Sequence, residues 1–214
     1  MDPIVEFENV GVSLGGRRIL AGIDLKLAPG GRVGIVGPNG SGKTTLVRTA
    51  ATLLSIDSGR AVVLGLGAES GDLSRARSAI GLIGHQPALI PELTLIENLT
   101  HVARLAAIDT GRIQHALEVV GLSEAADRRA SACSFGMRRR IEIAHLLLTK
   151  PRLLLLDEAA AGLDASARQL IAALVRSVGD RGGGTIVVSH DLNQLDSLCD
   201  HVLTLSSGRL EEAR

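Results

Sequence analysis

The chain carries at residues 37–45 the stretch Gly37-Pro38-Asn39-Gly40-Ser41-Gly42-Lys43-Thr44-Thr45, placed directly after the apolar run Val33-Gly34-Ile35-Val36. The spacing is G-x-x-x-x-G-K-[ST], in which a strand leads into a glycine-rich loop and then into a helix, expected here from Thr44 to about Leu54. Backbone N–H groups of such a loop and the positive end of the helix point at bound phosphates. The stretch therefore predicts a nucleotide site. The alternative interpretation is a glycine-rich turn without chemical meaning.

The residue types within this loop fit phosphate chemistry. We expect Lys43 to reach the β- and γ-phosphates and the Thr44 hydroxyl to bind Mg²⁺. The glycines would let the backbone approach a pyrophosphate that a Cβ atom would hold away. A nucleotide with Mg²⁺ is thus the expected ligand, bound by the run from Gly37 to Thr45.

Composition narrows the classes of partner. The 214 residues carry 23 basic and 23 acidic side chains and a formal net charge of zero, so we expect no nucleic-acid partner. The only aromatic residues are Phe7 and Phe135, so the core must be largely aliphatic. The two cysteines, Cys133 and Cys199, lack the spacing of a metal site, so we expect them to be buried and expect no metal other than Mg²⁺. No apolar run approaches the ~18–20 residues that span a bilayer, and Met1-Asp2-Pro3 does not resemble an export signal, so a soluble chain is expected.

The hydrophobic pattern predicts an α/β fold. Apolar runs bounded by turn residues are expected to form strands at 4–7, 23–27, 33–36, 61–65, 80–84, 152–156 and 185–189, the first of them in an antiparallel sheet. Residues 94–148 have helical spacing, with Thr94 and Glu97 as a helix start and Gly121 as a helix end, and a further helix is expected near 165–178. Strands and helices that alternate in this way imply a parallel or mixed sheet with an inserted helical part.

The apolar run Leu153-Leu154-Leu155-Leu156 ends in two carboxylates, Asp157 and Glu158. We expect Asp157 to hold Mg²⁺ through water and Glu158 to polarise the attacking water as general base. Taken alone, the pair could as well be an acidic cap after a buried strand. Its occurrence together with the phosphate loop favours phosphoryl transfer.

About twenty residues before this pair, the stretch Ala132-Cys133-Ser134-Phe135-Gly136-Met137-Arg138-Arg139-Arg140 resembles the signature loop of ABC-type ATPases. Ser134 and Gly136 match residues that, in the family, cap a helix whose amino end meets the γ-phosphate bound by the other subunit of a head-to-tail dimer. Three shorter stretches are also similar to family motifs: the Q-loop at Gly84-His85-Gln86-Pro87, the D-loop at Ala161-Gly162-Leu163-Asp164 and the switch histidine at Val188-Ser189-His190-Asp191. The resemblance extends from about residue 4 to about residue 210.

This resemblance implies an Mg²⁺-dependent ATPase that binds ATP, with the whole chain as a single ABC ATPase domain. The implied fold is a P-loop NTPase: a RecA-like core with a mixed sheet at about 1–86 and 151–214, an N-terminal antiparallel β-subdomain, and a helical signature subdomain at about 87–150. The implied catalytic residues are Glu158, His190, Gln86 and Lys43. The implied Mg²⁺ ligands are Thr44, Gln86 and Asp157, and the residues implied at the dimer interface are Ser134, Gly136 and Asp164.

Outside the family frame the smaller elements have plainer interpretations. Gln86 could be any loop amide, His190 a packed or solvent-facing imidazole, and Asp164 the start of a helix at Ala165. The arginines at 138–140 are expected to project from a helix in three directions and to be mainly solvated.

The chain also departs from the family at several positions. Leu14 stands where members usually place an aromatic ring against adenine. We therefore expect an aliphatic contact with the base and weak discrimination between ATP and GTP. Ala159 replaces the proline that usually follows the catalytic glutamate, and Cys133 and Phe135 are unusual within the signature loop. None of these changes removes a catalytic group.

As a function, the resemblance implies the ATP-hydrolysing subunit of an ABC transporter. It would dimerise with itself or with a second chain, sandwich two Mg-ATP, and drive a transmembrane permease on a separate chain from the cytoplasmic, inner face of the membrane. Residues 86–94 would contact the permease through Leu89-Ile90-Pro91. The Q-loop, the length and residues 93–99 resemble ATPases of the haem-exporter type used in cytochrome c maturation. The alternatives are a soluble ABC-type ATPase acting on ribosomes or DNA, and a regulatory module of a membrane complex that moves no solute.

Overall fold

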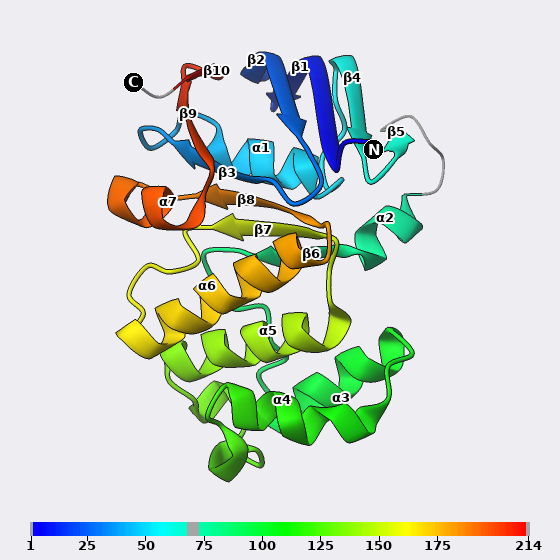
Figure 1. Cartoon of the computed structure of the whole chain (residues 1–214), viewed down its shortest axis with the longest axis vertical. Helices are drawn as coiled ribbons and strands as arrows, with labels where there is room; N and C mark the ends of the chain where they lie inside the picture. Colours follow the sequence, from blue (N-terminus) through cyan, green and yellow to red (C-terminus); the bar gives the residue numbers. More distant parts are fainter. Residues whose placement is uncertain (1, 68–72, 213–214) are drawn as a thin grey trace. The chain divides into compact units, whose positions relative to one another are not determined.

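The chain folds into two groups of elements, shown in Figure 1 for a computed structural model that describes residues 2–67 and 73–212. Residues 1–82, 151–159 and 177–214 form the sheet unit, and residues 83–150 and 160–176 form the helical unit. The sheet unit carries the phosphate loop, and the helical unit carries the stretch that resembles the signature loop. The division into a core and a helical subdomain at residues 86–87 and 150–151 stays a prediction.

The first sheet of the sheet unit is antiparallel, as the apolar pattern before the phosphate loop predicts. Its strand order is β2-β1-β4-β5. The bounds are Val5–Leu14 for β1, Arg17–Leu27 for β2, Ser58–Val63 for β4 and Leu66–Gly67 for β5. Its buried side chains, such as Val5 and Phe7 of β1, belong to the same hydrophobic core as those of the second sheet.

The second sheet is mixed and has the strand order β10-β9-β3-β8-β7-β6. Strand β3 is parallel to β8 and β9, β7 is parallel to β8, and β10 is antiparallel to β9. The bounds are Arg32–Val36 for β3, Ile80–Ile83 for β6, Leu153–Asp157 for β7, Gly184–Val188 for β8, His201–Ser206 for β9 and Arg209–Glu212 for β10. β7 and β8 are buried along their whole length, which is why they read as continuous apolar runs.

The sequence did not predict β9 and β10. Along β9 only Leu205 is fully buried, so the strand shows no continuous apolar run. It is nevertheless held in the sheet by its parallel pairing with β3, in which His201 lies opposite Val33 and Thr204 opposite Val36. A strand near the edge of a sheet depends on such pairing more than on burial.

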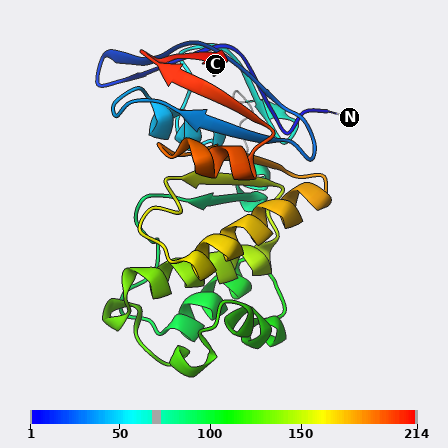
Figure 2. The ribbon, with the colours of Figure 1, turned by 60° about the vertical axis from the view of Figure 1, so that its left-hand side comes forward.

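Helices cover both faces of β3. Figures 1 and 2 show α1 (Lys43–Ala50) between the two sheets, and its residues Leu46 and Val47 share a core with Ile35. The neighbouring residue Gly34 faces the opposite side, where a Cβ atom would lie 3.3 Å from the Leu195 side chain of α7 (Leu192–Leu198). A further short helix, α2, spans Ser74–Ser78.

Helix α1 ends at Ala50, four residues before the predicted end at Leu54. The backbone of Thr52 has a positive φ of 57°, and the Leu53 N–H donates to the Arg48 carbonyl at 2.9 Å. This is the Schellman arrangement, which closes a helix and turns the chain away. Its presence here at a threonine rather than at glycine explains why the sequence did not reveal it.

The helical unit contains α3 (Leu95–Leu105), α4 (Ile113–Val119), α5 (Phe135–Thr149) and the first part of α6 (Ala165–Asp180). Three short 3₁₀ turns connect them, at Thr110–Arg112, Ser123–Ala125 and Ala130–Ala132. The predicted start of α3 is confirmed, because the Thr94 hydroxyl accepts from the Glu97 N–H while the Glu97 carboxylate accepts from the Thr94 N–H. Gly121, with a φ of 68°, ends α4 as predicted.

Replacing Gly59 by alanine should destabilise the first sheet. Gly59 has a φ of 83°, and a Cβ atom there would lie 2.3 Å from the Asn9 carbonyl oxygen of β1. Left-handed backbone costs ~1–2 kcal/mol for a residue with a Cβ atom, and the clash adds to that cost. We expect Gly59→Ala to lower the free energy of unfolding by at least ~2 kcal/mol, as measured by urea denaturation.

The matched control for this prediction is Gly16→Ala in the β1–β2 turn. Gly16 has a φ of 77°, yet a Cβ atom there would meet nothing within 4 Å. Gly16→Ala should therefore lower the free energy of unfolding only by the cost of the left-handed backbone, about 1 kcal/mol. Equal losses for the two variants would show that the clash at Gly59 is relieved by backbone movement.

Candidate active site

The phosphate loop closes around its own lysine. β3 ends at Val36, and α1 begins at Lys43, after Gly42 with a φ of 108°. The Lys43 Nζ atom donates to the carbonyl oxygens of Gly37 at 2.7 Å and Pro38 at 2.9 Å. The ammonium group is therefore held over the loop, where a phosphate could exchange for these carbonyl partners.

Two further features of the loop fit a bound triphosphate. The Ser41 Oγ atom is buried and has no hydrogen-bond partner among the described residues, although buried polar groups are ordinarily paired. The Thr44 side chain lies exposed at the first turn of α1, where a hydroxyl can face solvent or an ion. Gly37 has a structural role beyond the predicted one, because a Cβ atom there would clash with the Leu205 carbonyl oxygen of β9. Its absence of a side chain permits close strand packing as well as phosphate approach.

The two carboxylates lie at the carboxyl end of β7, as predicted: Asp157 is its last residue and Glu158 follows it. Asp157 is 7% exposed, whereas Glu158 adopts a left-handed backbone with a φ of 54°. The Glu158 N–H donates to the Val188 carbonyl of β8 at 3.0 Å, and its Oε2 atom lies 3.0 Å from Nδ1 of His190. Strained backbone of this kind persists only where the surroundings hold it, and it clusters at functional sites. The sheet unit thus brings together Glu158 and His190, which are 32 residues apart.

A cavity of about 330 Å³ joins these groups. It is lined by Ile19, Asn39, Gly40, Gly42, Lys43, Thr44, Thr45, Asp157 and Glu158. Seven of the predicted ligand positions therefore face one space together with the proposed base, because the carboxyl ends of β3 and β7 lie at the same edge of the sheet.

The apolar wall of this cavity differs from the one expected. Leu14, the residue expected at the base, is 42% exposed at the end of β1 and is not among the lining residues. Ile19 of β2 lines the cavity instead, and its Cγ2 atom would lie 3.3 Å from a Cβ atom on Gly42. Sequence reasoning missed Ile19, because the strand was expected only at 23–27, whereas β2 begins at Arg17.

Truncation of Ile19 should weaken nucleotide binding more than truncation of Leu14. Loss of its apolar surface corresponds to roughly 1–1.5 kcal/mol, or about a tenfold rise in Kd. We expect this rise for Ile19→Ala and a change below about twofold for Leu14→Ala, measured with a fluorescent ATP analogue. If Leu14→Ala raised the Kd more than Ile19→Ala does, the base contact would lie at Leu14, as predicted.

The other predicted residues lie in the helical unit. Ser134 caps α5 by accepting from the Met137 N–H at 3.3 Å, and a Cβ atom on Gly136 would meet nothing within 4 Å. Gln86 is exposed in the irregular segment after β6. Ser134 and Gly136 thus belong to the start of α5, and Gln86 to the 84–94 segment.

Asp164 starts α6, as its plainer interpretation predicts. Its Oδ1 atom accepts from the Ala167 N–H at 2.7 Å, and its Oδ2 atom lies 3.1 Å from Nη2 of Arg140. The hydrogen bond from Ala167, followed by that from Arg140, lowers the pKa of the Asp164 carboxyl below its ordinary value. The carboxylate is therefore charged throughout the neutral range.

The prediction that residues 138–140 are mainly solvated is wrong for Arg139. Its side chain is only 1% exposed, and its Nη1 atom donates to Glu142 Oε2 at 2.7 Å. Arg140 is half-buried and donates to Asp164. A run of three charges on a helix points in three directions, and here one of those directions is the interior of the helical unit. The buried acid Glu142 is its partner, which sequence reasoning did not identify.

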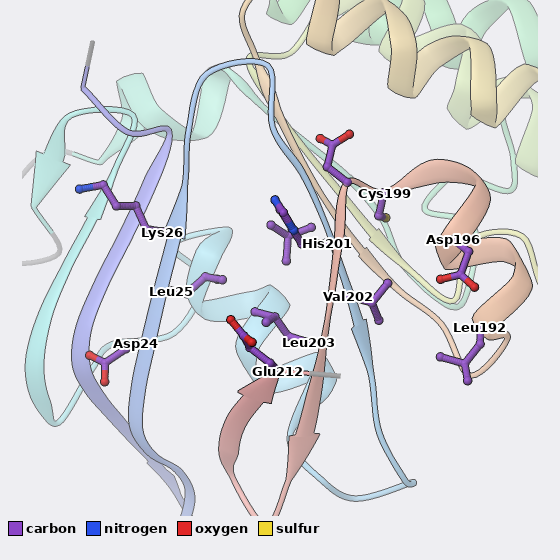
Figure 3. Close-up of a pocket in the computed structure, with 12 residues that line it drawn as sticks. Asp24, Leu25, Lys26, Leu192, Asp196, Cys199, His201, Val202, Leu203 and Glu212 are labelled. Carbon is purple, nitrogen blue, oxygen red and sulfur yellow. The ribbon is translucent and has the colours of Figure 1, made fainter. Parts of the chain in front are cut away.

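A larger cavity of the sheet unit lies elsewhere. Figure 3 shows the side chains of β2, α7 and β9 that surround this space of about 770 Å³. Its lining includes the four acids Asp24, Asp196, Asp200 and Glu212. Carboxylates at this density repel a triphosphate, so size alone does not make this cavity the nucleotide site. The smaller cavity is lined by Lys43, whose positive charge attracts a triphosphate.

Cys199 at the wall of this larger cavity should react slowly with alkylating agents. Burial raises the pKa of its thiol to about 12, so the reactive thiolate is scarce below that pH. In a Cys133→Ser background we expect iodoacetamide at pH 8 to react roughly 10³-fold more slowly with the folded protein than with the protein in guanidinium. The rate should rise about tenfold per pH unit. Rates within tenfold of each other would contradict the burial of the thiol.

Residues 20–161 match the family model described as ABC transporter. The chain belongs to the ABC transporter family. It is 32% identical over 209 residues to the Nod factor export ATP-binding protein I of Rhizobium etli, covering 96% of this chain and 66% of that protein. It is 33% identical over 213 residues to the linearmycin resistance ATP-binding protein LnrL of Bacillus subtilis, covering 97% and 68% respectively. The chain therefore spans about two thirds of the length of these two relatives.

A solved structure agrees with this membership. A bacterial Atm1-family ABC exporter with ATP bound superposes with a TM-score of 0.87 at 28% identity, covering 99% of this chain and 38% of that one. The predicted P-loop fold with a mixed sheet and helical parts is thereby confirmed. The chain is an ATP-binding subunit of an ABC transporter, and its family hydrolyses ATP with Mg²⁺.

The finer prediction of a haem-exporter type is not supported, because the two relatives are named for Nod factor export and linearmycin resistance. Within residues 2–67 and 73–212, no helix is both long enough and apolar enough to cross a bilayer.

Proposed function

We propose that this chain binds Mg-ATP in the cavity at Lys43 and hydrolyses it with Glu158 as general base. The observation that carries the proposal is the gathering of the phosphate loop, Asp157 and Glu158 around one cavity, with His190 against Glu158 at 3.0 Å. A cation, a metal-binding hydroxyl, a buried carboxylate and a general base are the groups that phosphoryl transfer requires.

In this proposal each residue keeps one task. Lys43 leaves the carbonyls of Gly37 and Pro38 and binds the β- and γ-phosphates. Glu158, whose side chain is 20% exposed, takes the proton of the attacking water, and His190 holds its carboxylate in place. Thr44, Asp157 and Gln86 would hold Mg²⁺. When bound, the ion would neutralise charge on the phosphate oxygens.

The proposal extends to a head-to-tail dimer, formed with a second copy or with a related chain. Ser134 and Gly136 stand at the start of α5, where N–H groups and the helix dipole favour an anion. In the dimer, this helix end and Asp164 would complete the ATP site of the partner. A single subunit would then hydrolyse ATP slowly.

We further propose that the dimer drives export through a permease on a separate chain, from the cytoplasmic face of the membrane. One relative is named for Nod factor export and the other for linearmycin resistance, which supports a role in export. They give no support to the haem-exporter type, and the proposal does not extend to it. Ile90, which is 39% exposed between the half-buried Leu89 and the exposed Pro91, is proposed as the apolar contact for the permease.

Glu158→Gln should abolish most hydrolysis while leaving ATP binding intact. The amide keeps the size of the side chain but cannot accept the proton of water, so turnover should fall by ~10²-fold or more. The variant should also accumulate as a dimer with ATP, because the ATP bound between the two subunits is not hydrolysed. Phosphate release and size-exclusion chromatography with light scattering measure the two effects.

Two control variants accompany this experiment. Glu118→Gln changes an exposed glutamate of α4, 58% exposed, and should leave turnover unchanged. Lys43→Ala removes the phosphate cation, so it should lose ATP affinity as well as turnover. Ordinary turnover in Glu158→Gln would overturn the proposed base.

A further inference from the structure

An ion pair lies buried within the helical unit, one turn from the start of α5. The side chains of Arg139 and Glu142 are 1% and 7% exposed, and their Nη1 and Oε2 atoms are 2.7 Å apart. Desolvation lowers the pKa of the arginine and raises that of the glutamate, each opposed by the other's charge. Long charged side chains are seldom buried so completely, so the pair calls for a reason other than packing.

Both members of the pair bond to the segment that carries Gln86. The Arg139 Nη2 atom donates to the His85 carbonyl at 3.1 Å, and the Ala88 N–H donates to Glu142 Oε1 at 2.8 Å. These bonds lie on either side of Gln86 in the chain. Each carboxylate oxygen of Glu142 is used once, so the two ties depend on one another.

Among the described residues, 85–89 make no backbone–backbone hydrogen bond to another element, whereas Pro91 and Leu93 accept from the Ser131 and Ala130 N–H groups at 3.0 Å and 2.9 Å. Residues 84–94 form no helix or strand between β6 and α3. Their second half is bound by Asn98 of α3, which is 6% exposed: its Oδ1 atom accepts from the Ile90 N–H at 2.8 Å, and its Nδ2 atom donates to the Ile90 and Thr94 carbonyls at 3.1 Å and 2.9 Å. The first half, around Gln86, is bound through the ion pair.

The same arginine contacts the stretch that resembles the signature loop. Its guanidinium carbon lies 5.2 Å from the centre of the Phe135 ring, within the range of a cation–π contact. Phe135 follows Ser134, the cap of α5. One buried side chain therefore touches the residue beside Ser134 and the residue beside Gln86.

Stability alone does not account for this arrangement. A buried ion pair can often be replaced by apolar residues of similar volume without loss of stability, because desolvation offsets the attraction. Here the Arg139 Nε atom is in addition buried without a partner among the described residues. A pair that contributes little to stability but fixes the ends of an irregular segment is better explained by positioning.

We infer that Arg139 and Glu142 are positioning residues that hold Gln86 in register with the start of α5. Through them, the 85–88 segment and the helix end at Ser134 form one rigid piece. A movement of Gln86 in response to the nucleotide then also moves the signature stretch, because no flexible loop lies between them. This inference rests on the proposed roles of Gln86 and Ser134 in ATP hydrolysis.

The test is a cycle of four forms of the full chain: wild type, Gln86→Ala, the paired replacement Arg139→Met with Glu142→Leu, and all three changes together. The paired replacement removes both charges at once and so leaves no lone buried charge. We expect its turnover to fall by ~10- to 10²-fold, as for a misplaced catalytic group, with ATP affinity within about twofold of wild type. In the Gln86→Ala background it should have almost no further effect.

Two results would overturn the inference. One is an equal loss of turnover from the paired replacement in both backgrounds, which would mark a general structural effect. The other is unchanged turnover in the paired replacement when Gln86→Ala is strongly impaired. If Gln86→Ala itself turns over normally, the role of Gln86 fails, whereas failure of the proposed function as a whole shows as ordinary turnover in Glu158→Gln.

A matched control and a direct readout complete the experiment. Arg138→Met removes the same type of side chain from the same helix, and within the described part of the chain Arg138 makes no hydrogen bond to residues 85–88. It should leave turnover within about twofold of wild type. Amide hydrogen exchange of residues 85–89 should accelerate at least tenfold in the paired replacement and not in Arg138→Met. Unchanged exchange there would overturn the inference even if activity were lost through poor folding.

Discussion

The carboxyl ends of parallel strands in a buried sheet lie along one edge, and the candidate site of this chain depends on that constraint. β3 leads there into the phosphate loop, β7 ends in Asp157, and β8 is followed by His190. Apart from Asp157 at its end, β7 is apolar, and both β7 and β8 are buried throughout. The loops that follow the strands therefore collect the polar groups, and the sheet holds them within reach of one another. The contact between Glu158 and His190 exists only because β7 and β8 are neighbours.

Electrostatics within the phosphate loop are arranged before any ligand arrives. The Lys43 ammonium is bound by two loop carbonyls, which lower the cost of holding a charge in a half-enclosed space. The buried Ser41 hydroxyl has no hydrogen-bond partner within the part of the chain that the structure describes. A triphosphate offers acceptors for both groups. Donors held at the place where charge develops are a main way in which proteins stabilise transferring phosphoryl groups, and here Lys43 has only to exchange its two carbonyl partners for phosphate oxygens.

In the helical unit, buried polar side chains fix the conformation of the irregular segment 84–94. Residues 84–94 form no helix or strand, so buried side chains supply many of their partners, in addition to backbone bonds from Ala130 and Ser131 near the end of the segment. Asn98 binds one half of the segment and the pair of Arg139 and Glu142 binds the other. Buried polar groups that are satisfied in this way specify one conformation, whereas an apolar contact would tolerate several.

The sequence by itself determined the local features of this protein. The phosphate loop, the helix start at Thr94 and Glu97, and the helix end at Gly121 all follow from residue types at short spacing, because their hydrogen bonds close within a few residues. Only the tertiary structure decided that Arg139 is buried, that Ile19 rather than Leu14 lines the cavity, and that β9 and β10 complete the sheet. Each of these depends on partners far along the chain. A hydropathy pattern cannot show that Arg139 pairs with the buried Glu142, or that pairing with β3 keeps β9 in the sheet.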